Sequence, residues 1–160
     1  MWPLTSILYN TKYNVAGTSF TSWTKGGNTV TGSLNVSSTL ADNETNNGTK
    51  TLALSVGSFA INTGSSVANG SVSIPSTDQR TLSRVGTYDI GAYEYQGVIW
   101  DGSSSTAWNT TANWTENAMP TTSVGAGIPT GLSTYPVITQ TSATPAPCKN
   151  LEIASGATLT

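Results

Sequence analysis

Five of the fourteen charged residues lie within seventeen positions, the densest group of side chains able to do acid–base or metal chemistry. We call this group the ionic cluster; it consists of Asp78, Arg80, Arg84, Asp89 and Glu94. The carboxylates of Asp89 and Glu94 suit glycoside cleavage, which uses a pair of carboxyl groups. They also suit Ca²⁺, a cation that prefers oxygen ligands. The third interpretation is structural, with the two guanidinium groups binding the carboxylates and holding neighbouring loops together.

Three tryptophans, Trp100, Trp108 and Trp114, form a second group within fifteen positions. Aromatic faces pair with the C–H faces of pyranose rings, so one interpretation is a sugar-stacking surface. The other is core packing, because spacings of eight and six residues place the indoles on successive strands or turns. Burying such large rings supplies the apolar area that a small unit needs. The sequence favours packing and leaves stacking as the alternative.

Several other kinds of site are excluded by composition. The chain has no His, so histidine-dependent triads and histidine metal sites are absent. Its six Lys and Arg residues are too few and too scattered for a nucleic-acid surface. Cys148 is the single cysteine and is expected to be a small buried residue. We therefore assign no catalytic residue and expect no cofactor, with Asp89 and Glu94 left as weak Ca²⁺ candidates.

The elements that position these groups are predicted to be β-strands. Ser and Thr make up 49 of the 160 residues, Asn adds 13, and the net charge is only -2. No sustained helical periodicity occurs, and short β-rich runs are separated by Gly, Asn, Asp and Ser. The predicted strands are residues 6–9, 28–36, 51–56, 72–74, 90–95, 98–100, 136–139, 150–153 and 157–160. Their irregular spacing suits a right-handed parallel β-helix, whereas composition alone leaves open a β-sandwich with hairpins at Asn47-Gly48 and Asn69-Gly70.

Several motifs of the first part of the chain follow one another in a fixed order. They are Ser33-Leu34-Asn35-Val36, Ser58-Phe59-Ala60-Ile61-Asn62-Thr63-Gly64, Asp78-Gln79-Arg80, Arg84, and the heptad Asp89-Ile90-Gly91-Ala92-Tyr93-Glu94-Tyr95. From Gly32 to Tyr95 this order resembles the closing segment of the bacterial parallel β-helix proteins called choice-of-anchor Q proteins. Phe59 stands where that family has Pro, and Thr81 where Gly is usual. The resemblance implies that residues 1–96 are the terminal coils of a parallel β-helix, with the ionic cluster as a structural lock on its closing segment.

Residues 98–160 carry a different pattern. A Trp-rich opening at Trp100–Trp114 is followed by Asn150-Leu151-Glu152-Ile153-Ala154-Ser155-Gly156-Ala157-Thr158-Leu159-Thr160. This is similar to a repeated module of large secreted and surface proteins, especially of the Bacteroidetes, in which a Trp-rich cap opens a β-solenoid. The resemblance implies that residues 97–160 are a Trp-rich cap and the first coil of a second β-solenoid, truncated after Thr160. The boundary is expected near Gln96-Gly97.

The predicted function is that of a non-catalytic structural or adhesive segment of a secreted bacterial cell-surface or extracellular filament protein. The alternative is a carbohydrate-binding β-helix module of a polysaccharide-degrading protein, and a lyase or hydrolase fragment is a third. We expect an extracellular location, with the export signal outside this sequence, and no membrane span. The expected partners are neighbouring coils of a longer chain, further copies stacked head to tail, and glycans. Six N-glycosylation sequons occur, little above chance for this composition, at Asn35, Asn43, Asn47, Asn69, Asn109 and Asn113.

Overall fold

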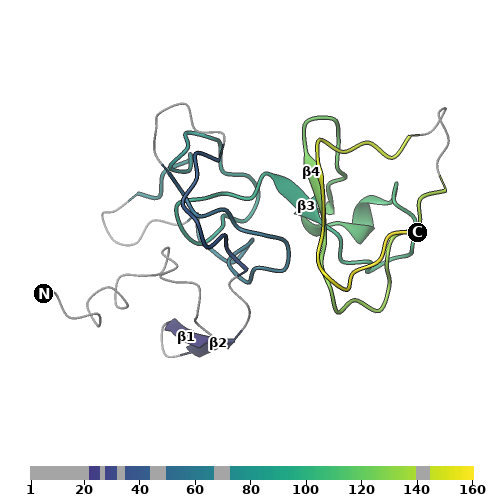
Figure 1. Cartoon of the computed structure of the whole chain (residues 1–160), viewed down its shortest axis with the longest axis horizontal. Helices are drawn as coiled ribbons and strands as arrows, with labels where there is room; N and C mark the ends of the chain where they lie inside the picture. Colours follow the sequence, from purple (N-terminus) through teal and green to yellow (C-terminus); the bar gives the residue numbers. More distant parts are fainter. Residues whose placement is uncertain (1–21, 26–27, 32–34, 44–49, 67–72, 140–144) are drawn as a thin grey trace, which may run out of the picture. The chain divides into compact units, whose positions relative to one another are not determined.

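The computed structural model describes residues 22–25, 28–31, 35–43, 50–66, 73–139 and 145–160 (Figure 1). The predicted strand at 6–9 lies outside the described residues. The chain divides into two compact units, Met1–Tyr95 and Gln96–Thr160. The described parts are mostly non-helical, as expected for an all-β chain, and their sheets are small. No helix in these parts is long and apolar enough to cross a membrane.

The first unit contains an antiparallel hairpin of β1 (Ser22–Lys25) and β2 (Asn28–Thr31), drawn in purple in Figure 1. The register pairs Ser22 with Thr31 and Lys25 with Asn28. Two residues therefore join the strands, the connection length of the tightest hairpins. The strand predicted at 28–36 is confirmed for residues 28–31, and residues 32–34 lie outside the described residues. The strand β1 was not predicted.

The rest of the first unit is held by isolated bridges and a small core. The bridges pair Val36 with Leu54, Ala41 with Thr51 and Thr77 with Ser83, and all three are antiparallel. The buried core consists of Leu54, Ala60 and Ile90. A β-helix requires parallel pairing between coils, and no parallel pair occurs among the described residues of this unit.

The strands predicted at 51–56 and 90–95 do not form. In the second of these segments, the backbone N–H groups of Glu94 and Tyr95 donate to side-chain carboxylates. Backbone groups bound in this way are not available for a strand ladder. The motif at 58–64 nevertheless lies against the closing heptad, since Ile90 N donates to Ala60 O at 2.9 Å. Gly64 allows this approach, because a Cβ there would lie 2.5 Å from the carbonyl oxygen of Tyr88.

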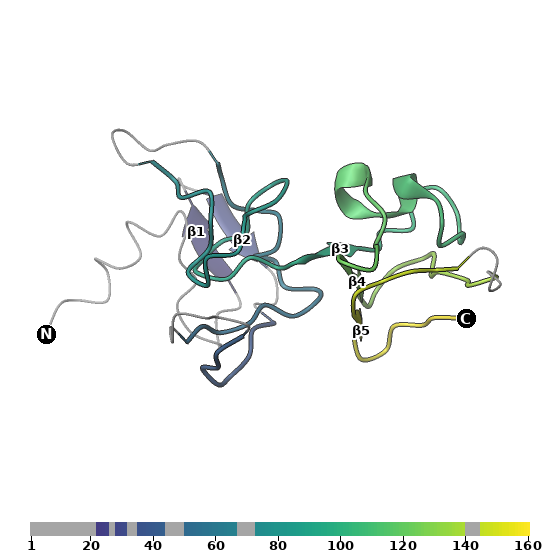
Figure 2. The same cartoon turned by 90° about the horizontal axis from the view of Figure 1, so that it is seen from above.

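The second unit is built on a parallel sheet of β3 (Gly97–Ile99), β4 (Gly125–Ile128) and β5 (Leu151–Ile153), in that order (Figures 1 and 2). The register places Val98 beside Ala126 and Ala126 beside Leu151. The 3₁₀ turns η1 (Thr111–Asn113) and η2 (Thr115–Asn117) lie between β3 and β4 in the chain. The predicted strands at 98–100 and 150–153 are confirmed to within a residue or two, and β4 was missed.

A second row of parallel contacts accompanies this sheet. Ala107 forms a parallel bridge with Val137, whose N–H donates to Thr106 O at 2.8 Å. On its other side, the same segment exchanges two hydrogen bonds with Thr160, from Ile138 N at 2.7 Å and to Pro136 O at 3.2 Å. The segments predicted as strands at 136–139 and 157–160 are therefore hydrogen-bonded to each other, although neither forms a continuous strand.

Candidate functional site

The first ion pair of the ionic cluster joins Arg80 to Asp78. Arg80 Nη2 and Nε lie 2.7 and 2.8 Å from Asp78 Oδ2, and both residues are buried. The guanidinium also donates to the carbonyl oxygens of Glu94, at 2.5 Å, and Asn43, at 3.2 Å. It lies 3.7 Å from the ring centroid of Tyr93, close enough for a cation–π interaction. This pair therefore connects three segments that are far apart in the sequence.

The second ion pair joins Arg84 to Glu94 across the closing heptad. Arg84 Nη1 lies 2.8 Å from Glu94 Oε2, and Nη2 donates to the carbonyl oxygen of Gly91 at 2.6 Å. Glu94 is 1% exposed and also accepts the backbone N–H groups of Val85 at 3.1 Å and Asp89 at 3.0 Å. Gly91 has a φ of 114°, a conformation that favours glycine. The carboxylate of Glu94 thus fixes both ends of the turn that precedes the heptad.

Asp89 is the third carboxylate of the ionic cluster, and its two oxygens accept hydrogen bonds from backbone N–H groups. Its Oδ1 accepts the N–H of Asn62 at 2.7 Å, and its Oδ2 accepts the N–H of Tyr95 at 2.5 Å. Burial raises the pKa of Asp89 to about 7, against the lowering effect of these two hydrogen bonds. The charge of Glu94 raises this pKa further, and Arg84 lowers it. Asp89 thus joins the 58–64 motif to the end of the heptad.

The carboxylates of Asp89 and Glu94 are poorly placed for calcium or for catalysis. Each of their four oxygens accepts an N–H group of the chain itself, and the two residues are 3% and 1% exposed. A cation or a glycosidic oxygen would have to displace these donors. Among the described residues, no group of three or more His, Cys, Asp or Glu side chains gathers in a way that could hold a metal ion. Hydrogen bonds of the cluster connect the segments around Asn43 and Asn62 to residues 78–95.

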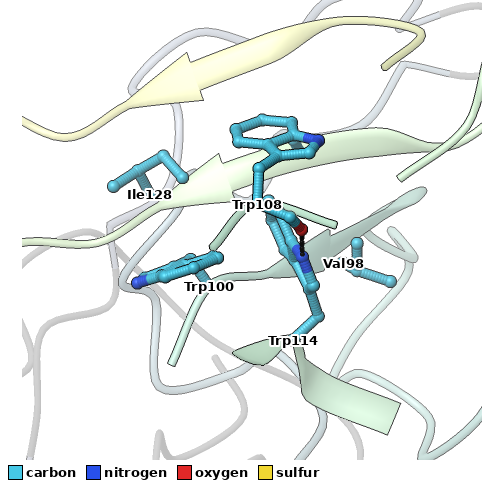
Figure 3. Packing of buried hydrophobic residues seen from close by; sticks show 6 residues of the cluster. Val98, Trp100, Trp108, Trp114 and Ile128 are labelled. Atoms are coloured by element: carbon cyan, nitrogen blue, oxygen red, sulfur yellow. Dashed lines mark hydrogen bonds between the residues drawn. The ribbon is translucent and has the colours of Figure 1, made fainter. Parts of the chain in front are cut away.

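The three tryptophans of the second group form the centre of the second unit's core (Figure 3). The Trp114 ring packs edge to face against Trp100 and Trp108, with ring centroids 5.1 and 4.8 Å apart. Trp114 Nε1 donates to the carbonyl oxygen of Trp108, and Trp100 Nε1 donates to that of Thr134, each at 2.9 Å. Trp108 Nε1 is buried and has no hydrogen-bond partner in the described part of the chain. Ile128 and Val98 pack on the same cluster.

These rings present no platform for a sugar. Trp100, Trp108 and Trp114 are 0%, 1% and 1% exposed, so no indole face is open to a pyranose ring. The burial of all three indoles supports core packing and gives no support to the sugar-stacking alternative. Cys148, expected to be a small buried residue, is half-buried and packs against the same core.

Asn113, which begins a sequon and lies at the end of the Trp-rich opening, is a structural residue. It is fully buried, and its Oδ1 accepts the N–H groups of Ser104 at 2.9 Å and Ser105 at 2.7 Å. Its Nδ2 donates to Ser105 Oγ at 3.0 Å and to Ala107 O at 2.9 Å. One amide thereby organises the loop that leads to Trp108. The only sequence signal was its position directly before a tryptophan, which is weak in a chain with 13 Asn.

A cleft of about 220 Å³ opens on the first unit, beside the closing heptad. Its walls combine aliphatic side chains with the ring of Tyr93 and the polar side chains of Gln79 and Lys50. The lining residues are Val36, Leu40, Lys50, Thr51, Leu52, Leu54, Gln79, Ile90, Gly91, Ala92 and Tyr93. An aromatic ring and two polar side chains thus line the same cleft.

Comparison of the chain with models of protein families, with curated proteins and with solved structures found no match.

Proposed function

We propose that the chain is a non-catalytic structural segment of a secreted bacterial surface or filament protein. The observation that carries this proposal is how the ionic cluster uses its polar groups. All three carboxylates accept backbone N–H groups, and both guanidinium groups donate to backbone carbonyl oxygens. Side chains that elsewhere do acid–base chemistry here replace the hydrogen bonds that loops cannot make with one another.

The pairing in the second unit supports a β-solenoid start. Two rows of parallel contacts involve the same three levels of chain, one at β3, β4 and β5 and one at Ala107, Val137 and Thr160. The chain runs from β3 to Ala107, then from β4 to Val137, and then from β5 to Thr160. Each of these three passes contributes one segment to both rows, which is the connectivity of successive solenoid coils. A stack of such coils would give the second unit an extended, regular scaffold.

The proposed role is tested by looking for turnover and binding in the intact chain. The purified protein is incubated with a panel of plant and algal polysaccharides, and reducing ends are measured, with a glycan array run in parallel. We expect no released ends and no retained glycan. Cleavage that disappears in Asp89→Asn or Glu94→Gln, while both variants remain folded by calorimetry, would show that the cluster is an active site and overturn the proposal.

The carbohydrate-binding alternative is favoured by the cleft beside Tyr93. An aromatic ring next to an amide and an ammonium group is a combination that binds sugars by stacking and hydrogen bonds. Lys50→Ala and Gln79→Ala change only exposed residues of the lining. If a glycan binds and both variants weaken its binding, whereas the exposed-site control Asn109→Ala does not, this second function is supported.

A further inference from the structure

Hydrogen bonds attach the closing heptad to the 58–64 motif. Ile90 N donates to Ala60 O at 2.9 Å, and Asp89 Oδ1 accepts the N–H of Asn62 at 2.7 Å. Ile90 also belongs to the buried core of the first unit. Separation of the two segments would therefore expose part of this core to water.

The carboxyl group of Asp89 lies at this contact without an ion pair. Asp89 is 3% exposed, and neither of the two salt bridges found among the described residues includes it. Its Oδ2 accepts the N–H of Tyr95 at 2.5 Å, so each of its oxygens binds an uncharged donor. The 58–64 motif that packs against it contains no charged residue. A buried carboxylate that is not paired with a cation is costly, and separation of the segments would hydrate it.

The charged groups near Asp89 do not offset this cost. Burial is the largest effect and raises the pKa of Asp89 to about 7, against the lowering effect of its backbone hydrogen bonds. Glu94, in the same heptad, raises this pKa further, and Arg84 lowers it. Arg84 is already paired with Glu94 at 2.8 Å. Asp78 and Arg80 bind each other and the backbone of Glu94.

We propose that the carboxyl group of Asp89 is a pH-sensitive switch, which keeps the closing heptad on the 58–64 motif when protonated and weakens this contact when ionised. Ionisation favours separation because the separated state hydrates the charge. Residues 90–93 of the heptad line the cleft beside Tyr93, so separation would also remove one wall of that cleft. The switch is independent of the function proposed above.

The direction of the switch follows from the two protonation equilibria. With the heptad in place, Asp89 titrates near 7, whereas a hydrated Asp titrates at 3.8. Between these values, the closed state holds a proton that the open state releases. The equilibrium constant for opening should therefore rise by at most about tenfold per pH unit in this window and stay constant outside it.

Amide hydrogen exchange of the intact chain measures this opening residue by residue. Protection factors, corrected for the intrinsic exchange rate at each pH, are compared from pH 4 to 8. Protection of the amides of Asn62, Ile90 and Tyr95 should fall as the pH rises to about 7. The amides of Ala41 and Ala126, which are hydrogen-bonded elsewhere in the chain, should keep constant protection. Constant protection at all five amides, or an equal fall at all five, would overturn the proposal.

Two substitutions with the same chemical change identify the titrating group. Asp89→Asn cannot ionise, so protection of the Ile90 amide should become independent of pH, whatever its absolute level. Asp42→Asn, at an exposed position of the first unit, should keep the wild-type pH profile. If the pH dependence survives in Asp89→Asn, another group is responsible and the proposal is wrong.

A measurement on wild type decides the matter if Asp89→Asn does not fold. The side-chain carboxyl carbon resonance of Asp89, followed by NMR, should titrate near 7. The protection of the Ile90 amide should stop falling at the same pH. A carboxyl titration near 3.8 in the folded chain would refute the switch.

Discussion

At the scale of single residues, the ionic cluster places three carboxylates beside two guanidinium groups. The two salt bridges use Asp78 and Glu94, and Asp89 makes no salt bridge with a described residue. The cluster therefore contains three carboxyl groups and two guanidinium groups, which leaves an excess of one potential negative charge. Burying such a charge is costly, and a carboxyl group in this position takes up a proton more readily.

The raised pKa of Asp89 predicts a pH dependence of stability. Between the ordinary value of 3.8 and about 7, the folded chain holds a proton that the unfolded chain releases. Stability from this group is therefore complete below pH 3.8 and is lost as the pH rises to 7. The slope approaches about -1.4 kcal/mol per pH unit at most. Denaturant unfolding of wild type and Asp89→Asn at several pH values isolates this term as the difference between the two proteins.

Asp89→Asn should also be less stable than wild type at low pH, by about 1–3 kcal/mol, because its NH₂ group faces a backbone N–H. That difference should shrink as the pH rises and change sign before pH 7, because wild type loses about 1.4 kcal/mol per pH unit over the roughly three units from 3.8 to about 7. A difference that stays constant from pH 4 to 8 would show that Asp89 titrates at its ordinary value in the folded chain.

Thr81 is a strained residue in the loop between the two arginines. Its φ is 71°, a left-handed conformation that a β-branched side chain rarely adopts. We expect Thr81→Gly to raise the free energy of unfolding by about 1 kcal/mol, since glycine adopts this conformation without strain. Thr77→Gly, at an exposed residue without positive φ, should lower it. Calorimetry of the two variants measures both changes in stability. If both substitutions destabilise the chain, Thr81 is not strained.

At the scale of elements, short strands depend on buried polar side chains for their connections. The loop between β3 and the tryptophan core turns around the amide of Asn113, which makes four hydrogen bonds. Such a group is costly to remove because its partners stay buried and unsatisfied.

Asn113→Ala is therefore predicted to destabilise the second unit by about 3 kcal/mol or more. Asn109→Ala is the matched control, at an exposed position four residues earlier in the same loop. Its effect should stay within about 0.5 kcal/mol of wild type. Hydrogen exchange of the amides of Ser104 and Ser105 gives the local readout: their protection should fall in Asn113→Ala only.

Strand prediction succeeded where side chains carry the signal. Val98-Ile99 and Leu151-Glu152-Ile153 have the β-branched and alternating residues typical of strands, and both segments form them. The Gly-Ala-Gly of β4 has no such pattern, and this strand exists because all four of its residues are buried between two neighbours. The heptad at 89–95 looked like a strand, but its backbone groups are taken by carboxylates from the same heptad and from Asp78. Such tertiary hydrogen bonds cannot be deduced from local sequence.

The sequence indicated which residues belong to the candidate site better than it indicated which groups they contact. The density of charge between residues 78 and 94 identified five residues that salt bridges and hydrogen bonds connect, and charge is rare elsewhere in this chain. That Asp89 would bind the N–H of Asn62 depends on a contact across 27 positions, which no local pattern contains. The structural role of Asn113 could not be predicted, because Asn is common throughout the sequence and no single Asn stands out.

At the scale of the whole molecule, the chain has two compact units with separate cores. The first contains the two salt bridges found among the described residues, and the second contains the tryptophan core. We expect Arg80→Ala, which leaves Asp78 buried without its counter-ion, to cost the first unit about 3–5 kcal/mol. Residue-resolved hydrogen exchange should show the loss in the first unit only. Equal loss of protection around Trp114 would mean that the two units unfold together.

The geometry of the tryptophans has one more consequence. Three indoles at van der Waals separation, with ring planes 87° and 78° apart, are chromophores whose electronic transitions couple strongly. The folded second unit should therefore carry an exciton couplet in its far-ultraviolet circular dichroism. That optical signature would vanish as soon as the rings separate, and it would report on this unit within the intact chain without any added label.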